Sequence, residues 1–271
     1  MRFSTREDVI SITPLNPFDR FDDGRPKVPD DLIKRMKLVT VEEAWSVLVK
    51  HGYNYQFEGH WVNLHPDRVL VGRAITTTMV PLRPDLNDVV KAQGEREGRH
   101  GSQNNWVIHT VGENDVVVVD LFGKVKHGTF VGDNLSTAVS SQKGTGLVID
   151  GGIRDTVGVH DNLPDINVFC RGFDPTGIRE VTLISLNGPT RIGQATVLPG
   201  DIVLGSLTGV IFIPPHLVEE VVTTSEEIRI RDEFGKQRLR EGKYTSGQID
   251  VSVWEDDIEA DFQEWRKQRQ S

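Results

Sequence analysis

Three charged residues stand at a spacing that could do chemistry together: Asp133, and the adjacent pair Arg154 and Asp155. The twenty residues between Asp133 and Arg154 have the pattern of a short helix, a Gly turn, a buried strand and a Gly-Gly turn. Such a unit returns the chain to its starting point, so we expect the three side chains to face one small space. Two carboxylates suit a hard divalent cation, and an arginine beside them suits an anionic substrate.

Asp133 also has a plainer explanation, because it stands just before a predicted helix and could serve only as its N-cap. The functional interpretation does not exclude this role. The first turn of a helix offers free backbone N–H groups, here those of Asn134 and Leu135, and such groups attract carboxylates.

The pair Arg154 and Asp155 could likewise be a solvated turn with a surface ion pair worth ~0–1 kcal/mol. The preceding Gly151-Gly152 argues against this, since two glycines after a buried strand let the backbone approach a ligand closely. The two side chains also leave the backbone in different directions. One can therefore hold a substrate carboxylate while the other holds a metal.

Composition limits the class of protein. The 271 residues are 37% hydrophobic and 26% charged, which is ordinary for a soluble globular chain, and the net charge of −9 argues against nucleic-acid binding. No apolar run approaches the ~18 residues that cross a bilayer. The N-terminus lacks the apolar stretch of a secretory signal. We therefore expect a cytoplasmic protein with no membrane partner.

Other catalytic motifs fail to appear. Cys170 is the only cysteine and lies in a strand-like run, so we expect it to be buried packing. The eight histidines show no zinc-hydrolase spacing, and no phosphate-binding loop or serine-esterase motif occurs. Gly144-Thr-Gly146 precedes a strand, the reverse of a dinucleotide fingerprint, so we expect no nucleotide cofactor.

The N-terminal third carries two predicted helices. Residues 1–29 are polar and Pro-rich, and they are expected to wrap another surface or to be disordered. One helix is expected over 30–36. A second begins at Thr40, which with Glu43 can form a capping box, and ends at His51-Gly52. Its predicted apolar stripe is Val41, Ala44, Trp45, Leu48 and Val49.

The middle of the chain alternates strands and helices. Residues 68–80 are β-rich, with Val69, Val71, Ala74 and Ile75 as candidates for burial. A helix broken near 98–101 is expected within 84–111. Residues 115–120 and 146–150 are short apolar runs typical of strands buried on both faces. Residues 181–213 alternate β-branched residues with turns, which predicts several antiparallel strands.

Two helices are expected at the C-terminus. Pro214-Pro215 opens a long helix whose inner face carries Leu217, Val221 and Ile228. A last helix, 254–267, has four apolar residues on one stripe, which could dock on its own subunit or on a neighbour: Trp254, Ile258, Phe262 and Trp265. One domain with terminal extensions is the simplest organisation.

Three segments together resemble the RraA-like family: 132–138 (GDNLSTA), 146–155 (GLVIDGGIRD) and 198–210 (LPGDIVLGSLTGV). That family includes class II 4-hydroxy-4-methyl-2-oxoglutarate/4-carboxy-4-hydroxy-2-oxoadipate aldolases and the regulator of ribonuclease activity A, and many members were once labelled demethylmenaquinone methyltransferases. The resemblance covers roughly residues 40–240. The spacing of an Asp, twenty residues and an Arg-Asp pair marks the aldolase branch.

The resemblance implies an α/β fold, a β/β/α swivelling phosphohistidine-domain-like sandwich, with the catalytic domain over 40–242 and helical extensions over 1–39 and 243–271. It implies homotrimers or homohexamers with sites between subunits. It also implies cleavage of a 4-hydroxy-2-oxo acid to pyruvate and a carbonyl product through a metal-stabilised enolate. Oxaloacetate decarboxylation is the expected side activity of the same site.

Carried over by residue, the resemblance implies that Asp155 ligates Mg²⁺ or Mn²⁺ and that Asp133 holds the ion through water. Arg154 would bind the pyruvyl part of the substrate and polarise its oxygen. The backbone amides of Asn134 and Leu135 would receive the substrate carboxylate. A carboxylate from the late helix of a neighbouring subunit would complete the metal shell, and the candidates are Asp232 and Glu233.

Two departures bear on the substrate. Family aldolases tend to be acidic where this chain has Gly205-Ser-Leu-Thr-Gly209, and the terminal extensions are long. A non-catalytic regulator that binds a protein partner is the alternative function. A methyltransferase is disfavoured because no Gly-rich loop follows an early strand and leads into a helix.

Overall fold

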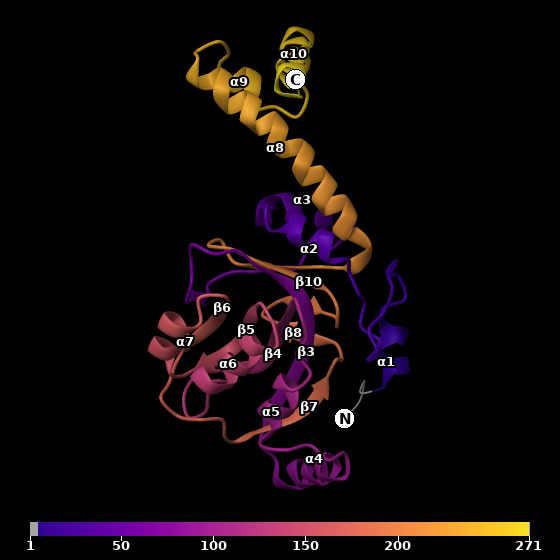
Figure 1. Cartoon of the computed structure of the whole chain (residues 1–271), viewed down its shortest axis with the longest axis vertical. Helices are drawn as coiled ribbons and strands as arrows, with labels where there is room; N and C mark the ends of the chain where they lie inside the picture. The colour runs from indigo at the N-terminus through magenta and orange to yellow at the C-terminus, as the bar shows by residue number, and fades with distance from the viewer. Residues whose placement is uncertain (1–4, 271) are drawn as a thin grey trace. The chain divides into compact units, whose positions relative to one another are not determined.

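Four parallel strands form the centre of the main sheet. The computed structural model describes residues 5–270, and the chain divides into two compact units, Met1–Val222 and Thr223–Ser271. The parallel strands of the first unit lie in chain order (Figure 1): β3 (Leu70–Pro81), β4 (Asp115–Lys124), β5 (Gly146–Ile153) and β6 (Asn167–Phe173).

Helices connect these strands, as parallel neighbours require. The pair α4 (Pro84–Arg96) and α5 (Gln103–Ile108) joins β3 to β4, and the break between them falls where Gly98 and Gly101 were expected to interrupt a helix. The connections from β4 to β5 and from β5 to β6 are α6 (Asp133–Ser141) and α7 (Thr156–Asn162).

Antiparallel strands extend the sheet at both edges. On one side β10 (Ile202–Gly205), β11 (Val210–Ile213) and β1 (Phe57–Glu58) follow β3, and on the other β2 (Val62–Asn63) pairs with β6. The far half of β3 pairs with β7 (Val181–Leu186), and β8 (Thr190–Ile192) forms a hairpin with β9 (Ala195–Val197). The antiparallel strands expected over 181–213 are confirmed, and the chain has a mixed α/β fold.

Strand β4 shows why the apolar runs within the predicted strands 115–120 and 146–150 are continuous and do not alternate with polar residues. Val117 and Val119 enter a core that includes Val139 of α6 and Val159 of α7, whereas Val116 and Val118 enter a second core on the opposite face. That second core contains Ile192, Ala195 and Val197 of the β8–β9 hairpin. Because helices cover one face and the hairpin covers the other, side chains of both parities are buried.

The expected N-terminal helices are confirmed as α2 (Asp30–Met36) and α3 (Val41–Lys50). The capping box of Thr40 and Glu43 is present, and α3 ends at Lys50 with His51 as its C-cap. Two burial predictions were wrong: Trp45 is 48% exposed and Val69 is 42% exposed. In α3 the buried stripe uses Val47 instead, because it lies three residues from Ala44. Both face a third core, which includes Ile211 of β11.

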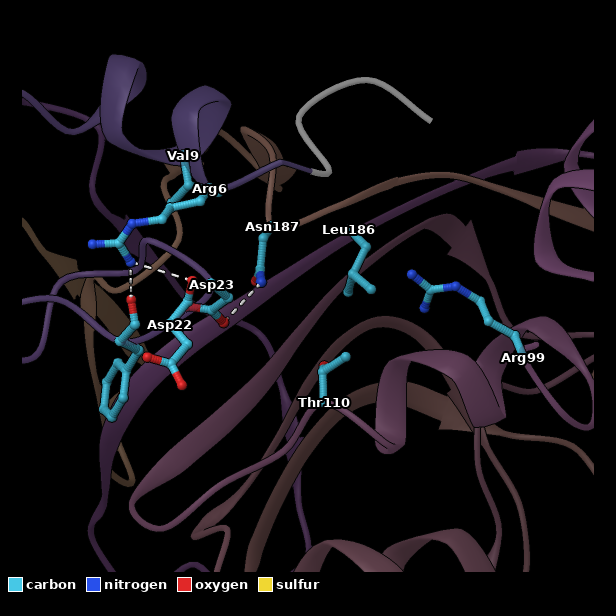
Figure 2. A pocket seen from close by; sticks show the side chains of 9 residues that line it. Arg6, Val9, Asp22, Asp23, Arg99, Thr110, Leu186 and Asn187 are labelled. Atoms are coloured by element: carbon cyan, nitrogen blue, oxygen red, sulfur yellow. Dashed lines mark hydrogen bonds between the residues drawn. The ribbon is translucent and has the colours of Figure 1, made fainter. Parts of the chain in front are cut away.

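The N-terminal arm, residues 5–29, packs on its own chain, and residues 1–4 lie outside the described part. It begins with α1 (Arg6–Ile12). Arg25 forms a bidentate pair with Asp115 at the start of β4, at 2.9 and 3.0 Å, and both residues are buried. Figure 2 shows a further attachment, where the Asn187 amide donates to Asp23 at 3.2 Å.

The second unit is built around an aromatic core. The chain enters it along α8 (Val218–Arg240), then passes through α9 (Ser246–Ile249) to α10 (Asp256–Gln270). The predicted stripe of the last helix is buried and docks on Phe234 of its own chain. Among the described helices, none is long and apolar enough to cross a membrane.

Candidate functional site

The candidate site lies where β4, β5 and β6 end. In a parallel sheet the carboxyl ends of neighbouring strands share one edge, and the loops beyond them meet there. Backbone hydrogen bonds join the loop after β4 to the end of β5: Phe130 N–H donates to Gly152 O at 2.9 Å and Arg154 N–H donates to Val131 O at 3.0 Å. These two bonds hold the end of β5 beside the residues that precede Asp133, as the spacing predicts.

Asp133 is the first residue of α6, with Gly132 as the N-cap. The carbonyl of Gly132 accepts from both the backbone and the hydroxyl of Ser136, at 3.1 and 2.8 Å. The Asp133 side chain packs against Gly158 of α7, where an added Cβ would stand 3.1 Å from Asp133 Cβ. Asp133 is thus in the first turn, one residue beyond the N-cap position that its sequence context suggested.

Asp155 precedes α7 and adopts a left-handed backbone conformation, with φ 53° and ψ 38°. This region is uncommon for a residue with a side chain. The carbonyl of Asp155 accepts from Val159 N–H at 3.1 Å, the first hydrogen bond of the helix. The conformation turns the carboxylate back toward Arg154, whose Nη1 lies 3.2 Å from Asp155 Oδ2.

Gly132 makes room for both members of the pair. A Cβ at this position would stand 2.3 Å from Asp155 Oδ2 and 3.1 Å from Arg154 Nε. Its backbone φ of −122° is open to any residue, so the requirement for glycine here is one of space. The carboxylate and the guanidinium therefore lie directly against the N-terminus of α6.

Asp133, Arg154 and Asp155 line one open pocket of about 540 Å³. The side chains of Arg154 and Asp155 are 38% and 36% exposed, so both can reach a ligand. Two apolar side chains of the same pocket are unusually exposed, Val157 at 73% and Phe173 at 49%. The three predicted residues are therefore brought together, in a cavity with a partly apolar rim.

The oxygen donors present fit a hard divalent cation. Mg²⁺ is held in many proteins by one or two carboxylates, with waters and substrate oxygens filling the other positions. Asp133 and Asp155 could supply such carboxylates. Among the described residues, no three His, Cys, Asp or Glu side chains form a ready metal-binding group.

The two predicted amide donors, the backbone N–H groups of Asn134 and Leu135, differ in whether a protein group already accepts their hydrogen bond. Asn134 N–H donates to Asp133 Oδ1 at 2.8 Å, so a substrate carboxylate could take this donor only if Asp133 turned away. The Leu135 side chain is partly buried and packs against the core beside α6. Its backbone N–H belongs to the first turn of the helix, where intrahelical partners are lacking.

Asp232 and Glu233 lie on α8 within the second unit. Asp232 accepts from Lys236 Nζ at 2.8 Å, and Glu233 is bonded to Arg269. Both carboxylates therefore already have cationic partners in their own unit. Their assignment to the metal shell of a neighbouring subunit stays a prediction.

Sequence reasoning missed the contribution of the segment after β6. Phe173, Asp174 and Pro175 line the pocket. Hydrogen bonds from the hydroxyl and backbone N–H of Thr176 hold the pKa of the Asp174 carboxyl below its usual range. A usable signal existed, because β6 is the next parallel strand after β5 and must end at the same edge.

Cys170 is buried in β6, as expected. Burial raises the pKa of its thiol to about 12, so the reactive thiolate is suppressed. This agrees with a packing role.

The family model described as RraA-like, Aldolase/RraA, matches residues 39–212. The chain belongs to the RraA-like family.

Two curated relatives illustrate this membership. A putative 4-hydroxy-4-methyl-2-oxoglutarate aldolase of Halalkalibacterium halodurans is 28% identical over 169 residues, which cover 61% of this chain and 78% of the relative. An uncharacterized protein of Methanocaldococcus jannaschii is 26% identical over 167 residues, with 60% and 79% covered.

Among solved structures, Streptomyces coelicolor RraAS2, described as an unusual member of the RNase ES inhibitor RraA protein family, superposes with a TM-score of 0.67. It is 24% identical, and the match covers 82% of this chain and 100% of the other. At this identity the likeness concerns the fold.

Proposed function

We propose that this protein is a divalent-metal-dependent aldolase that cleaves a 4-hydroxy-2-oxo acid to pyruvate and a second carbonyl compound. The observation that carries the proposal is the shared pocket of Asp133, Arg154 and Asp155 at the carboxyl ends of β4 and β5. The relative named as a putative aldolase supports the same reaction class. The swivelling phosphohistidine-domain-like architecture belongs to this proposal as well.

Arg154 is the residue that we assign to the reacting atoms. Its guanidinium presents several N–H donors in a planar fork, which matches the carboxylate and ketone oxygens of a 2-oxo acid. Cleavage of the carbon–carbon bond leaves a pyruvate enolate, and a fixed cationic donor stabilises this developing negative charge. Asp155, 3.2 Å from Arg154 Nη1, keeps the guanidinium facing the pocket.

Asp155 and Asp133 would hold Mg²⁺ or Mn²⁺, the former directly and the latter through water. The bound cation would supply Lewis-acid stabilisation of negative charge on the substrate oxygens. Decarboxylation of oxaloacetate produces the same pyruvate enolate, so this side activity is part of the proposal. A water positioned by Arg154 would take the proton of the 4-hydroxyl group as the carbon–carbon bond breaks, and would return a proton to the enolate carbon to give pyruvate.

A neighbouring subunit would complete the site. Val157 and Phe173 leave apolar surface exposed at the rim, and burial of apolar surface favours association. We place the site at an interface of a homotrimer or homohexamer, where the neighbour would also supply a further carboxylate ligand for the metal ion. Asp232 and Glu233 are the candidates for that ligand.

The deciding experiment measures pyruvate release from 4-hydroxy-4-methyl-2-oxoglutarate and from oxaloacetate by the full chain. Activity should stop with EDTA and return with Mg²⁺ or Mn²⁺. Arg154→Ala should lower kcat by about 10²–10³, the usual effect of removing one preorganised donor. Arg83→Ala removes a side chain that is 75% exposed and paired with Asp85; it is the matched control and should keep full activity.

The rival proposal is a non-catalytic regulator that acts by binding a protein partner, for which the exposed apolar rim is the supporting observation. It predicts no pyruvate release from any 2-oxo acid with any divalent metal. Near-wild-type rates in Arg154→Ala would instead remove Arg154 from the mechanism.

A further inference from the structure

A second pocket lies between the N-terminal arm and a part of the body formed by β9 of the hairpin and the ends of β10 and β11 in the main sheet. Its volume is about 270 Å³, and it shares no lining residue with the candidate active site. Arm residues 12–16 form one wall, and residues of the body, including Thr196 and Asp201, form the other.

The walls of this pocket are mainly apolar. Ile12, Pro14 and Leu15 contribute from the arm, and the body supplies a matching set: Leu198, Pro214 and Pro215. Such a lining suits a small organic group, since binding transfers apolar surface out of water.

One carboxyl group lies in this apolar setting. Asp201 lines the pocket and is only 3% exposed. Its Oδ2 accepts from Leu198 N–H at 2.8 Å. Among residues 5–270, no Lys, Arg or His forms an ion pair with Asp201. A buried carboxylate without a cationic partner is costly, so a partner from outside the chain would be strongly favoured.

The lining of this pocket has no Lys or Arg side chain that would attract an anionic ligand. Asp201 is the only acidic residue among those that line the pocket, and no Lys or Arg joins it. Tyr53 Oη and His216 Nε2 lie 3.3 Å apart and can bond to each other. Burial lowers the pKa of His216, which favours the neutral form of this imidazole. The pocket thus offers one carboxyl group, which becomes negatively charged when it ionises, and no Lys or Arg.

The neighbouring pocket of Figure 2 differs in this respect. It is lined by Arg6, Arg99, Asp22 and Asp23, charges of both signs. Arg6 already donates to the carbonyl of Phe21 at 2.6 Å. Asp23 accepts from Asn187 of the body, whereas Arg99 bonds to Glu97. Charges of both signs select no single ligand class.

We propose that the pocket beneath residues 12–16 binds a small organic amine, with its ammonium group on Asp201 and its apolar body against Leu15, Leu198 and Pro214. Such a ligand would contact both the arm and the body. It would therefore hold the arm against the domain, and the arm should open less often when the ligand is bound.

The test uses 4-fluorobenzylamine, an ammonium ion near neutral pH, and the neutral isostere 4-fluorobenzyl alcohol as probes. Binding to the full chain is followed by ¹⁹F NMR titration, without metal or 2-oxo acid, so the result does not depend on the proposed aldolase activity. The amine should bind at least about tenfold more tightly than the alcohol, because a buried charge gains a partner.

Two variants assign the binding site. Asp201→Asn keeps an acceptor for Leu198 N–H but removes the charge, and should erase the preference for the amine. Leu15→Arg places a cation at a side chain that is 62% exposed, where substitution spares the core, and should abolish amine binding. Asp88→Asn, on the exposed face of α4, is the control and should bind like wild type.

Equal affinity for amine and alcohol in the wild type would overturn the assignment of an ammonium ligand. Amine binding that survives Leu15→Arg would place the probe elsewhere and would equally overturn it, even if Asp201→Asn did not fold.

Discussion

Asp155 Oδ2 occupies the position that the Cβ of any residue other than glycine would need at Gly132, since an added Cβ would stand 2.3 Å away. The two residues are 23 positions apart in the chain, and the helix α6 and strand β5 lie between them. The candidate site therefore depends on a close approach between a helix N-terminus and the turn after a strand.

Gly132→Ala tests this approach. The added methyl group should displace the Asp155 carboxylate and Arg154 and lower kcat for pyruvate release by about 10²-fold, since displacements near 1 Å have such effects. The backbone φ of Gly132 is compatible with alanine, so the fold should persist. Gly177→Ala is the matched control because nothing lies within 4 Å of its added Cβ. Equal activity in both variants would mean that the position of Asp155 is unimportant.

Asp201→Asn should stabilise the protein at high pH. Burial raises the pKa of the Asp201 carboxyl to about 7, against an ordinary value of 3.8. Since the folded state then binds the proton more tightly than the unfolded state, wild-type stability from this group falls as pH rises from about 4 through about 7.

The asparagine variant avoids that loss. It should gain up to about 4 kcal/mol relative to wild type near pH 8, and the gain should shrink toward pH 4. Urea unfolding at the two ends of this range measures the difference. A gain that does not vary with pH would show that ionisation of Asp201 is not its source.

Arg25→Met should destabilise the first unit. The substitution leaves Asp115, which is 1% exposed, as a buried carboxylate without its bidentate partner. Removing one member of a buried pair typically costs 3–5 kcal/mol, measured here by chemical unfolding. The double variant Arg25→Met with Asp115→Leu should recover much of the loss. A double variant no more stable than the single one would point to lost contacts of the arm instead.

Phe234→Ala should loosen the second unit. The ring is fully buried, with its centroid 5.2 Å from Trp254 and 5.6 Å from Trp265. Such a cavity typically costs 3–5 kcal/mol. We expect weaker near-ultraviolet circular dichroism from these tryptophans. Leu239→Ala, at a side chain that is 38% exposed on the same helix, should leave the signal unchanged.

Local patterns were sufficient to predict most of the elements. The capping box of Thr40 and Glu43, the apolar runs of β4 and β5 and the aromatic stripe of α10 all act over a few residues, so the sequence specifies them directly. The turn-rich spacing over 181–213 predicted antiparallel strands for the same reason. Trp45 and Val69 show the limit of this reasoning, because helical or strand periodicity does not say which side chain at the edge of a stripe is covered.

The sequence by itself determined which residues could do chemistry, since the spacing of Asp133 from Arg154 and Asp155 is a property of the chain. Only the tertiary structure decided that β6 ends beside them and adds Asp174, and that the arm lines a pocket together with Asp201. These are contacts between segments far apart in the chain. They depend on strand order and on three-dimensional packing, which no local pattern of side chains encodes.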